Sequence, residues 1–74
     1  MPKARIRNRI RELREAAGLT QTDLAKRCGC TRQTIIMLEQ EKYVPSLSLA
    51  FGIAGVFGAA VEDVFTPETT DGTE

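Results

Sequence analysis

The spacing of helix-starting and helix-ending residues between positions 20 and 31 is the strongest constraint on how this chain can fold. Thr20 has the hydroxyl group of a good N-cap, and Asp23 lies three residues later in the place of a capping box. Gly29 is placed to end the helix that Thr20 begins, and Thr31 is placed to cap another. The turn between the two helices is therefore very tight, and the helices must cross steeply.

Small and apolar residues occupy the positions that such a crossing requires. Ala25 lets the two backbones approach closely, and Gly29 allows a positive φ in the turn. The pattern predicts helices over 21–28 and 32–40, with a generic helical hairpin as the simpler alternative. Their inward residues are Leu24, Ala25, Cys28, Ile35 and Leu38.

Apolar residues at helical spacing predict three further helices, over about 6–17, 47–57 and 61–65. Gly18 and Gly58 follow the first two as left-handed stops, and the apolar residue after Gly18 is placed to complete a Schellman cap. The inward residues of these two helices are Ile6, Ile10, Leu13 and Ala17 in the first, and Leu47, Ala50, Ile53, Ala54 and Phe57 in the second.

The chain ends in a run without an apolar residue that could pack, TPETTDGTE. We expect residues 66–74 to be a disordered acidic tail and residues 1–65 to form one all-α domain of five helices. No strand of useful length is predicted. A chain of 74 residues buries only about 60% of the surface that its unfolded form exposes, so a small margin of stability is expected.

The net charge of zero conceals a strong asymmetry along the chain. All ten basic residues lie at or before Lys42 together with five acidic residues, which gives that part a net charge of +5. The remainder has five acidic residues and no basic one. Such a first half is suited to a polyanion, although an ordinary solvated surface is the other interpretation.

Several classes of function find no support in the residues. Histidine is absent, and the sequence has neither paired acids in a predicted cleft nor a phosphate-binding glycine loop, so we expect no enzyme. Cys28 and Cys30 cannot complete a tetrahedral zinc site and would close almost no loop as a disulfide. They are best interpreted as small core residues, with a regulatory redox pair as the alternative. We expect no cofactor, metal or small-molecule ligand.

The sequence also lacks a membrane-spanning segment. No stretch approaches the roughly 20 uncharged apolar residues that a span requires. The start, MPKARIRNRI, is charged, and no apolar segment of a signal peptide follows it. A cytoplasmic protein without a membrane partner is therefore expected.

A family resemblance rests on the stretch LREAAGLTQTDLAKRCGCTRQTIIMLEQEKYVPSLSLAFGIAGVFG, followed by VEDVF. This stretch, about Ile10 to Phe65, resembles the Cro and lambda-repressor-like helix-turn-helix family, or XRE family, and in particular its short free-standing prokaryotic regulators. The combination of GLTQ, DLA, RQTI, LE and PSL is specific to it. The resemblance implies a five-helix DNA-binding domain, a third helix in the DNA major groove, and homodimers on near-palindromic operators.

The resemblance also implies which residues contact double-stranded DNA. Gln21 would contact a phosphate at the start of its helix, Arg32 suits guanine, and Gln33 suits adenine. The alternatives are simple solvation for Gln33 and Thr34, a core position for Met37, and packing on the next helix for Tyr43. The full set is Gln21, Thr31, Arg32, Gln33, Thr34, Ile36, Met37, Lys42 and Tyr43.

The sequence leaves three points open. Many relatives have Gly or Asn where this chain has Glu41, which leaves the path of the loop after the third helix undecided. A helix-turn-helix module that has lost DNA binding and now binds proteins is the rival function, and Ile36 and Met37 are the residues that favour it. Within DNA binding, the sequence does not distinguish a phage-type repressor or an antitoxin from a general regulator.

The helix predicted over 47–57 offers a surface for dimerisation. The chain has no charge between Lys42 and Glu62, and an uncharged exposed helix face is typical of an interface. Each glycine in this helix costs about 1 kcal/mol of helix propensity, which close packing against a partner would explain. The expected interface is the outer face of this helix together with the last short helix. Its residues in the longer helix are Leu49, Phe51, Gly52, Gly55 and Val56. Completion of the monomer core is the alternative role for these residues.

Overall fold

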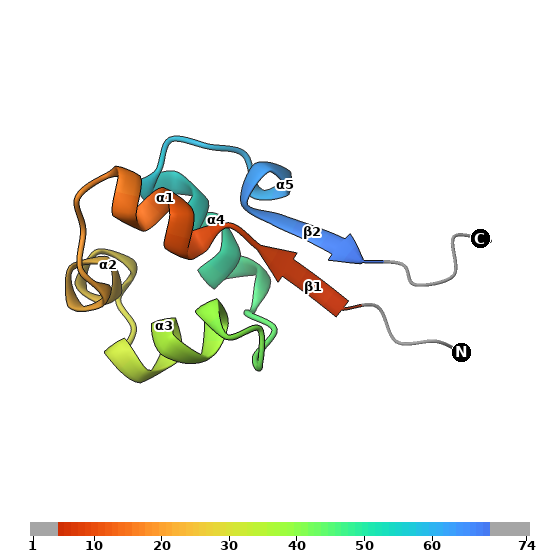
Figure 1. Cartoon of the computed structure of the whole chain (residues 1–74), viewed down its shortest axis with the longest axis horizontal. Helices are drawn as coiled ribbons and strands as arrows, with labels where there is room; N and C mark the ends of the chain where they lie inside the picture. Colours follow the sequence, from red (N-terminus) through yellow and green to blue (C-terminus); the bar gives the residue numbers. More distant parts are fainter. Residues whose placement is uncertain (1–4, 69–74) are drawn as a thin grey trace.

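The computed structural model describes residues 5–68, which form five helices and two short strands (Figure 1). The helices pack together, and the strands form a ribbon that extends from them. The elements in chain order are β1 (Arg5–Asn8), α1 (Ile10–Ala16), α2 (Gln21–Cys28), α3 (Arg32–Glu39), α4 (Leu47–Val56), α5 (Val61–Val64) and β2 (Phe65–Glu68).

Each helix contributes at least one fully buried aliphatic side chain to a single core. Burial of a side chain of this size stabilises the fold by about 1.5–3 kcal/mol, so this small set supplies much of the driving force. The largest fully buried residues are Ile10, Leu24, Ile35, Leu38, Ile53 and Val64. Of the inward positions predicted for the two crossed helices, Cys28 is only partly buried against the core, and the other four are buried as predicted.

Hydroxyl side chains begin three of the helices. Each oxygen accepts a hydrogen bond from the backbone N–H three residues later, which satisfies a donor that the helix itself leaves free. The caps are Thr20, Thr31 and Ser46. At α2, Asp23 also accepts from the Thr20 N–H at 2.9 Å, which completes the predicted capping box.

A left-handed residue follows each of the first four helices: Gly18, Gly29, Glu41 and Gly58, with φ of 73°, 73°, 60° and 63°. In each case the next N–H donates to the carbonyl five residues back, at 3.0 Å, which is the Schellman arrangement. The donors of these bonds are Leu19, Cys30, Lys42 and Ala59. The predicted stops are confirmed, and Glu41 takes the same conformation without being a glycine.

The first helix begins at Ile10, so the prediction of a helix from Ile6 is wrong. Ile6 lies in β1, which pairs antiparallel with β2 in the register Arg5↔Glu68 and Asn8↔Phe65. The side chain of Asn8 accepts a hydrogen bond from the Ile10 N–H at 3.1 Å, which gives the first N–H of α1 a partner, whereas the N-cap residue Arg9 makes no side-chain cap bond. Ala17, expected on the inward face, is exposed because α1 has already ended before it.

The chain after α5 also differs from the prediction. Phe65 is a buried strand residue, 8% exposed, rather than the end of the last helix. Thr66–Glu68 belong to β2 rather than to a disordered tail, because β1 supplies backbone partners that the local sequence does not reveal. Residues 69–74 of the predicted tail lie outside the described residues. The fold is mostly helical with five helices, so the all-α prediction is approximately right, and the small two-stranded sheet is the part that it missed.

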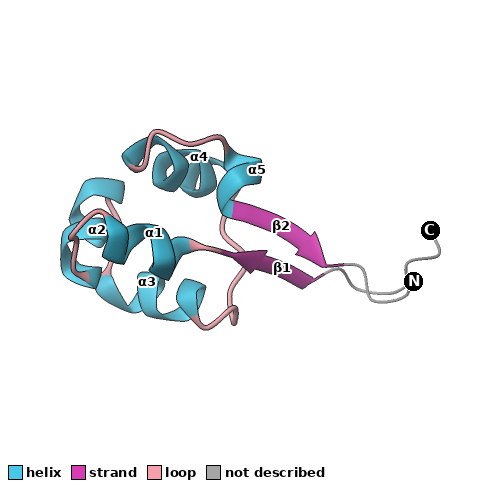
Figure 2. Cartoon of the chain, turned by 45° about the horizontal axis from the view of Figure 1, so that its top comes forward, coloured by secondary structure: helices cyan, strands magenta, loops and turns pink. Residues whose placement is uncertain are grey.

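The inward face predicted for α4 is correct along most of the helix but wrong at its N-terminal end. Ala50, Ile53 and Ala54 are buried as expected, but Leu47 is 70% exposed because the first turn extends beyond the residues that cover the core. At the other end, Phe57 packs partly against the core. Figure 2 shows α3 at the edge of the bundle, with one side facing away from the other helices.

Candidate nucleic-acid interface

The outer side of α3 carries most of the residues predicted to contact DNA. Arg32 and Gln33 are exposed in the first turn. Ile36 and Met37 are partly buried, but neither belongs to the group of side chains packed against the core. Because Ile35 and Leu38 are fully buried on the opposite side, the helix is held in place while its outer side stays accessible.

Thr31 and Thr34 already have partners within the helix start. The Thr31 hydroxyl oxygen accepts from the Thr34 N–H at 3.2 Å, and the two hydroxyl groups lie 3.1 Å apart. These contacts fix the first turn of α3, in which Arg32 and Gln33 lie between the two threonines. The two threonines therefore hold the turn that carries Arg32 and Gln33, and they also lie on the outer side of α3 themselves.

Gln21 lies at the first position of α2 and turns its amide towards the end of α3. Its Nε2 donates to Glu39 Oε1 at 3.1 Å, and the same carboxylate accepts from Arg14 Nε at 2.7 Å. Arg14 also donates from Nη1 to the Leu19 carbonyl at 3.0 Å. The network joins α1, α2 and α3. The sequence motifs include Gln21 and Glu39 but do not indicate this contact.

The ion pair at the centre of this network is shielded from solvent. The side chains of Arg14 and Glu39 are only 12% and 7% exposed. The hydrogen bond that Arg14 donates to Glu39 raises the pKa of Arg14 above its ordinary value. Removal of either partner would leave the other charge poorly solvated, so the pair fixes the relative positions of α1 and α3.

A groove of about 510 Å³ lies between α1, the start of α2 and α3. It brings Gln21 and Ile36, two predicted contact residues from different helices, to one surface. Arg11 also borders it. The complete lining is Arg11, Arg14, Leu19, Thr20, Gln21, Ile36, Glu39 and Gln40.

Most of the basic residues in the first part of the chain are paired with carboxylates. The pairs are Arg5 and Arg7 with Glu41 and Glu68, Arg9 with Glu12, Arg11 with Glu15, and Arg14 with Glu39. Within residues 5–68, four basic residues have no carboxylate within 4.0 Å: Lys26, Arg27, Arg32 and Lys42. The positive charge available to a polyanion is therefore smaller than the sequence suggests.

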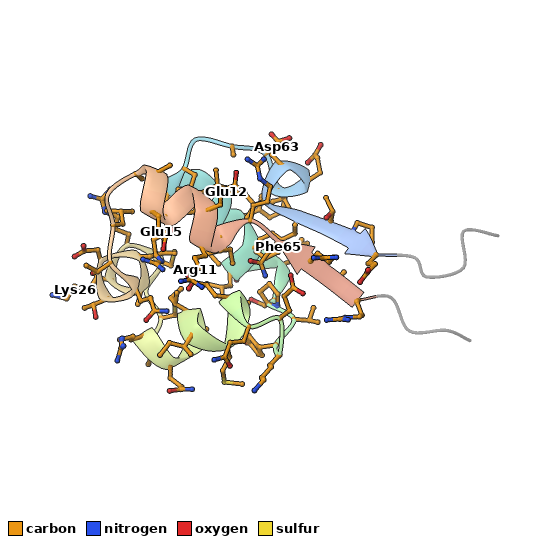
Figure 3. All side chains as sticks on the ribbon, in the orientation of Figure 1. Arg11, Glu12, Glu15, Lys26, Asp63 and Phe65 are labelled. Carbon is orange, nitrogen blue, oxygen red and sulfur yellow. The ribbon has the colours of Figure 1, made fainter. Side chains whose placement is uncertain are left out.

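Two of the four unpaired basic residues flank α3. Arg32 is its first residue, and Lys42 lies in the loop after it. Lys42 and Tyr43 are both exposed, and the Lys42 N–H donates to the Met37 carbonyl at 3.0 Å. Figure 3 shows Lys26 pointing outwards from α2.

Cys28 and Cys30 lie on either side of the turn between α2 and α3, and both are partly buried against the core. Burial raises the pKa of each thiol above its ordinary value. Since the thiolate is the reactive form, this environment disfavours redox chemistry and favours the interpretation of both as packing residues.

The residues predicted for a dimer contact divide into two groups. Leu49 and Val56 pack partly against the core of the monomer. Phe51 is 60% exposed, and a Cβ at Gly52 or Gly55 would meet no atom within 4 Å, so these three positions face open space.

Two features that would indicate other functions are absent from the described part of the chain. No helix in residues 5–68 is long and apolar enough to cross a membrane. Over the same residues, no group of three or more acidic or cysteine side chains is arranged to hold a metal ion.

The match to a known family covers the five helices almost from end to end. The helix-turn-helix family HTH_3 matches residues 10–64. The chain belongs to the helix-turn-helix family. Members of this XRE-type group are DNA-binding transcriptional regulators, so the family resemblance stated from the sequence is confirmed.

Relatives of this helix-turn-helix protein occur in archaea, bacteria and phages. An uncharacterized HTH-type transcriptional regulator of Archaeoglobus fulgidus is 55% identical over 60 residues, which cover 81% of this chain and 86% of the relative. An immunity repressor protein of Bacillus phage phi105 is 33% identical over 64 residues, covering 86% of this chain and 44% of the repressor.

A solved structure agrees with the fold. The crystal structure of the hypothetical transcription factor NHTF from Neisseria matches with a TM-score of 0.69 and 28% identity, covering 73% of this chain and 61% of that one. Family and relatives point to a transcriptional regulator and not to an enzyme.

Proposed function

We propose that this protein is a sequence-specific regulator that reads double-stranded DNA with α3. The accessible outer side of α3 is the observation that carries the proposal, because Arg32 and Gln33 are exposed while Ile35 and Leu38 hold the inner side against the core. A helix fixed in this way can enter the major groove without rearrangement of the core.

Each contact residue has a distinct role in this proposal. Arg32 donates to the O6 and N7 acceptors of guanine, and Gln33 pairs with the N6 and N7 edge of adenine. Ile36 and Met37 contact thymine methyl groups, whereas Lys42 and Tyr43 contact the backbone. The amide group of Gln21 has two N–H donors, and one of them is bonded to Glu39. Gln21 therefore contacts a phosphate through the other.

We further propose that the protein acts as a homodimer on near-palindromic operators and represses transcription by occupying them. The name of the phage relative supports repression. The exposed apolar residues of α4, Leu47 and Phe51, support dimerisation because they lie one helical turn apart and have no partner in the monomer core. Leu49 and Val56, partly committed to that core, would lie at the margin of the contact.

One alternative retains support from the structure. A helix-turn-helix module that binds another protein would use the partly exposed Ile36 and Met37, and the internal pairing of five arginines leaves less charge for DNA. Against it, the first turn of α3 is polar and its Arg32 has no carboxylate partner among the described residues.

Selection of bound sequences from random duplex DNA tests the proposal. We expect enrichment of two half-sites related by a two-fold axis, with centres about 34 Å apart on one face of the duplex. A control selection with Arg32→Ala should lose the preference at one base pair in each half-site. If the native protein enriches no sequence, the DNA-reading proposal fails and the protein-binding alternative replaces it.

A further inference from the structure

Glu41 adopts a backbone conformation that its residue type disfavours. Its φ is 60°, and it is the one residue other than glycine with a positive φ among residues 5–68. A Cβ makes this conformation unfavourable, whereas Gly adopts it without strain. Surrounding contacts must therefore hold this conformation, and those of the Glu41 side chain add to the backbone bonds of the helix end.

The carboxylate of Glu41 is directed towards β1, although the two lie far apart in the sequence. Its Oε2 accepts from the Asn8 N–H at 3.4 Å. Its two oxygens also lie 3.6 Å from Arg5 Nη2 and 3.9 Å from Arg7 Nε. The side chain is 20% exposed, so these contacts form in a partly shielded position.

Asn8 makes a second link between the same two parts of the molecule. Its Nδ2 donates to the Leu38 carbonyl at 2.8 Å, and Leu38 lies in the last turn of α3. The same carbonyl accepts from the Glu41 N–H at 2.9 Å. The end of β1 is thus bonded both to the C-terminal end of α3 and to the left-handed residue that follows it.

From these contacts we propose that Glu41 is a positioning residue through which the β1–β2 sheet holds the loop of Lys42 and Tyr43 for the DNA backbone. The inference rests on the proposed function, because it assigns that loop to DNA. The two loop residues directly follow Glu41, so a change in its backbone conformation moves both of them. The sheet therefore influences the DNA-binding loop through Glu41, and Glu41 itself does not contact DNA.

Charge alone leads to the opposite expectation. Glu41 is an anion beside a surface that is proposed to bind an anionic partner, and its removal leaves Arg5 and Arg7 with one carboxylate partner, Glu68, in place of two. On electrostatic grounds its loss should strengthen DNA binding. A loss of specific binding would therefore identify the positional role of this residue.

Glu68 provides a matched control. It lies in β2, and its carboxylate pairs with the same two arginines at 3.9 Å and 3.5 Å. Glu68→Gln likewise removes one negative charge from beside the same two arginines, but leaves the contact between Glu41 and Asn8 in place. Glu41→Gly removes that contact and relieves the backbone strain, so the variant is not expected to be less stable.

The experiment measures affinity for the selected operator and hydrogen exchange of backbone amides in both variants. Glu41→Gly should bind the operator about three- to tenfold more weakly, which is the range expected for one lost hydrogen bond, with an unchanged or higher melting temperature. The amides of Asn8 and Lys42 should exchange faster in this variant. Glu68→Gln should bind as tightly as the native protein or more tightly, with native exchange rates at both amides.

Two results would overturn the inference. Operator affinity of Glu41→Gly equal to or above that of Glu68→Gln would show that only charge matters. Native exchange rates at Asn8 and Lys42 in Glu41→Gly would show that the sheet does not hold the loop. If the native protein binds no duplex, the proposed function fails and the DNA role of Glu41 with it, while the exchange rates still decide whether the sheet and loop are coupled.

Discussion

Arg14 and Arg32 carry the same guanidinium group but occupy opposite environments. Arg14 is 12% exposed and bonded to Glu39 and to the Leu19 carbonyl, so its charge holds helices together. Arg32 is exposed at the start of α3 and has no ion-pair partner among residues 5–68. Only the second arginine is free to exchange water for a base edge without loss of an internal contact.

The division of labour between Arg32 and Lys42 follows from their positions. Arg32→Ala should weaken binding to the selected operator by about 1–3 kcal/mol and relax preference at one base pair in each half-site, because a bidentate base contact is lost. Lys42→Ala should weaken binding to all duplexes alike, because the proposed contact of its ammonium group is with a phosphate. Fluorescence anisotropy with the operator and with single-base variants separates these results. Equal losses on every sequence from both variants would reject Arg32 as a base-reading residue.

The sequence predicts the exposure of these contact residues better than it predicts their partners. Arg32 and Gln33 follow a helix cap, and their place on the outer side is set by the helical period alone. The bond from Gln21 to Glu39 joins residues 18 positions apart, and it depends on how α2 and α3 cross. The sequence motif includes such residues, but only the packed structure shows that one amide hydrogen of Gln21 is already bonded to Glu39.

At the level of secondary-structure elements, α2 shows how local residues fix a helix. Thr20 and Asp23 exchange hydrogen bonds of 2.9 Å in both directions at the first turn. The backbone N–H of Thr20 is the largest cause that lowers the pKa of Asp23, followed by the Thr20 side chain. Folding therefore favours the ionised carboxylate, because only the ionised form accepts these bonds fully.

This capping box predicts a pH dependence of stability. Because the pKa of Asp23 is lower in the folded state, its contribution is fully present above the ordinary pKa of about 3.9 and is lost as the pH falls through the lowered value. Asp23→Ala should therefore lower the urea midpoint at neutral pH, and the difference from the native protein should shrink in strong acid. Thr22→Ala, at an exposed neighbouring position, is the control. A difference that stays constant from pH 7 to strong acid would contradict this role of the carboxylate.

The elements that the sequence predicts are those whose signals are local. Thr20 and Thr31 act over three residues, and Gly18 and Gly29 act over one turn, so each helix end is evident from its own segment. β1 has no such signal, since Arg5–Asn8 pair with residues about 60 positions later. Ile6 lies four residues before Ile10 and so imitates a helical period, although its backbone is extended.

At the level of the whole molecule, ion pairing changes the meaning of the charge asymmetry. The first part of the chain has a net charge of +5, yet all five arginines from Arg5 to Arg14 lie within 4.0 Å of a carboxylate. A paired arginine must give up its carboxylate partner before it can bind a phosphate, whereas an unpaired basic residue gives up only water. The four unpaired basic residues should therefore release more counterions than the paired ones.

The salt dependence of operator binding tests this view of the charge. A dimer that neutralises on the order of 5 to 8 phosphates should give a log–log slope of roughly −5 to −7. Lys42→Ala removes one cation from each protomer and should reduce the steepness by about 2. Arg9→Ala should leave the slope nearly unchanged, because Arg9 is paired with Glu12 at 3.1 Å. Equal changes from both variants would show that paired arginines also contact phosphates.

The proposed dimer would use the most exposed of the large apolar side chains in residues 5–68. Val44, Leu47 and Phe51 are 65%, 70% and 60% exposed, and the last two lie one turn apart on α4. A domain that reads a single half-site binds weakly, so two recognition helices must be held about 34 Å apart. Burial of these side chains against a second copy would remove the apolar patch from water and supply that constraint.

Phe51→Glu should give a folded monomer. A charge in the centre of the proposed contact cannot be buried without a partner, whereas at an exposed position in the monomer it remains solvated. Sedimentation should show the change from dimer to monomer, with the helical circular dichroism retained and operator binding much weaker. Thr66→Glu adds the same charge at an exposed position of β2 and should remain dimeric. A Phe51→Glu protein that stays dimeric would place the interface elsewhere, and one that unfolds would show that Phe51 serves the core of the monomer.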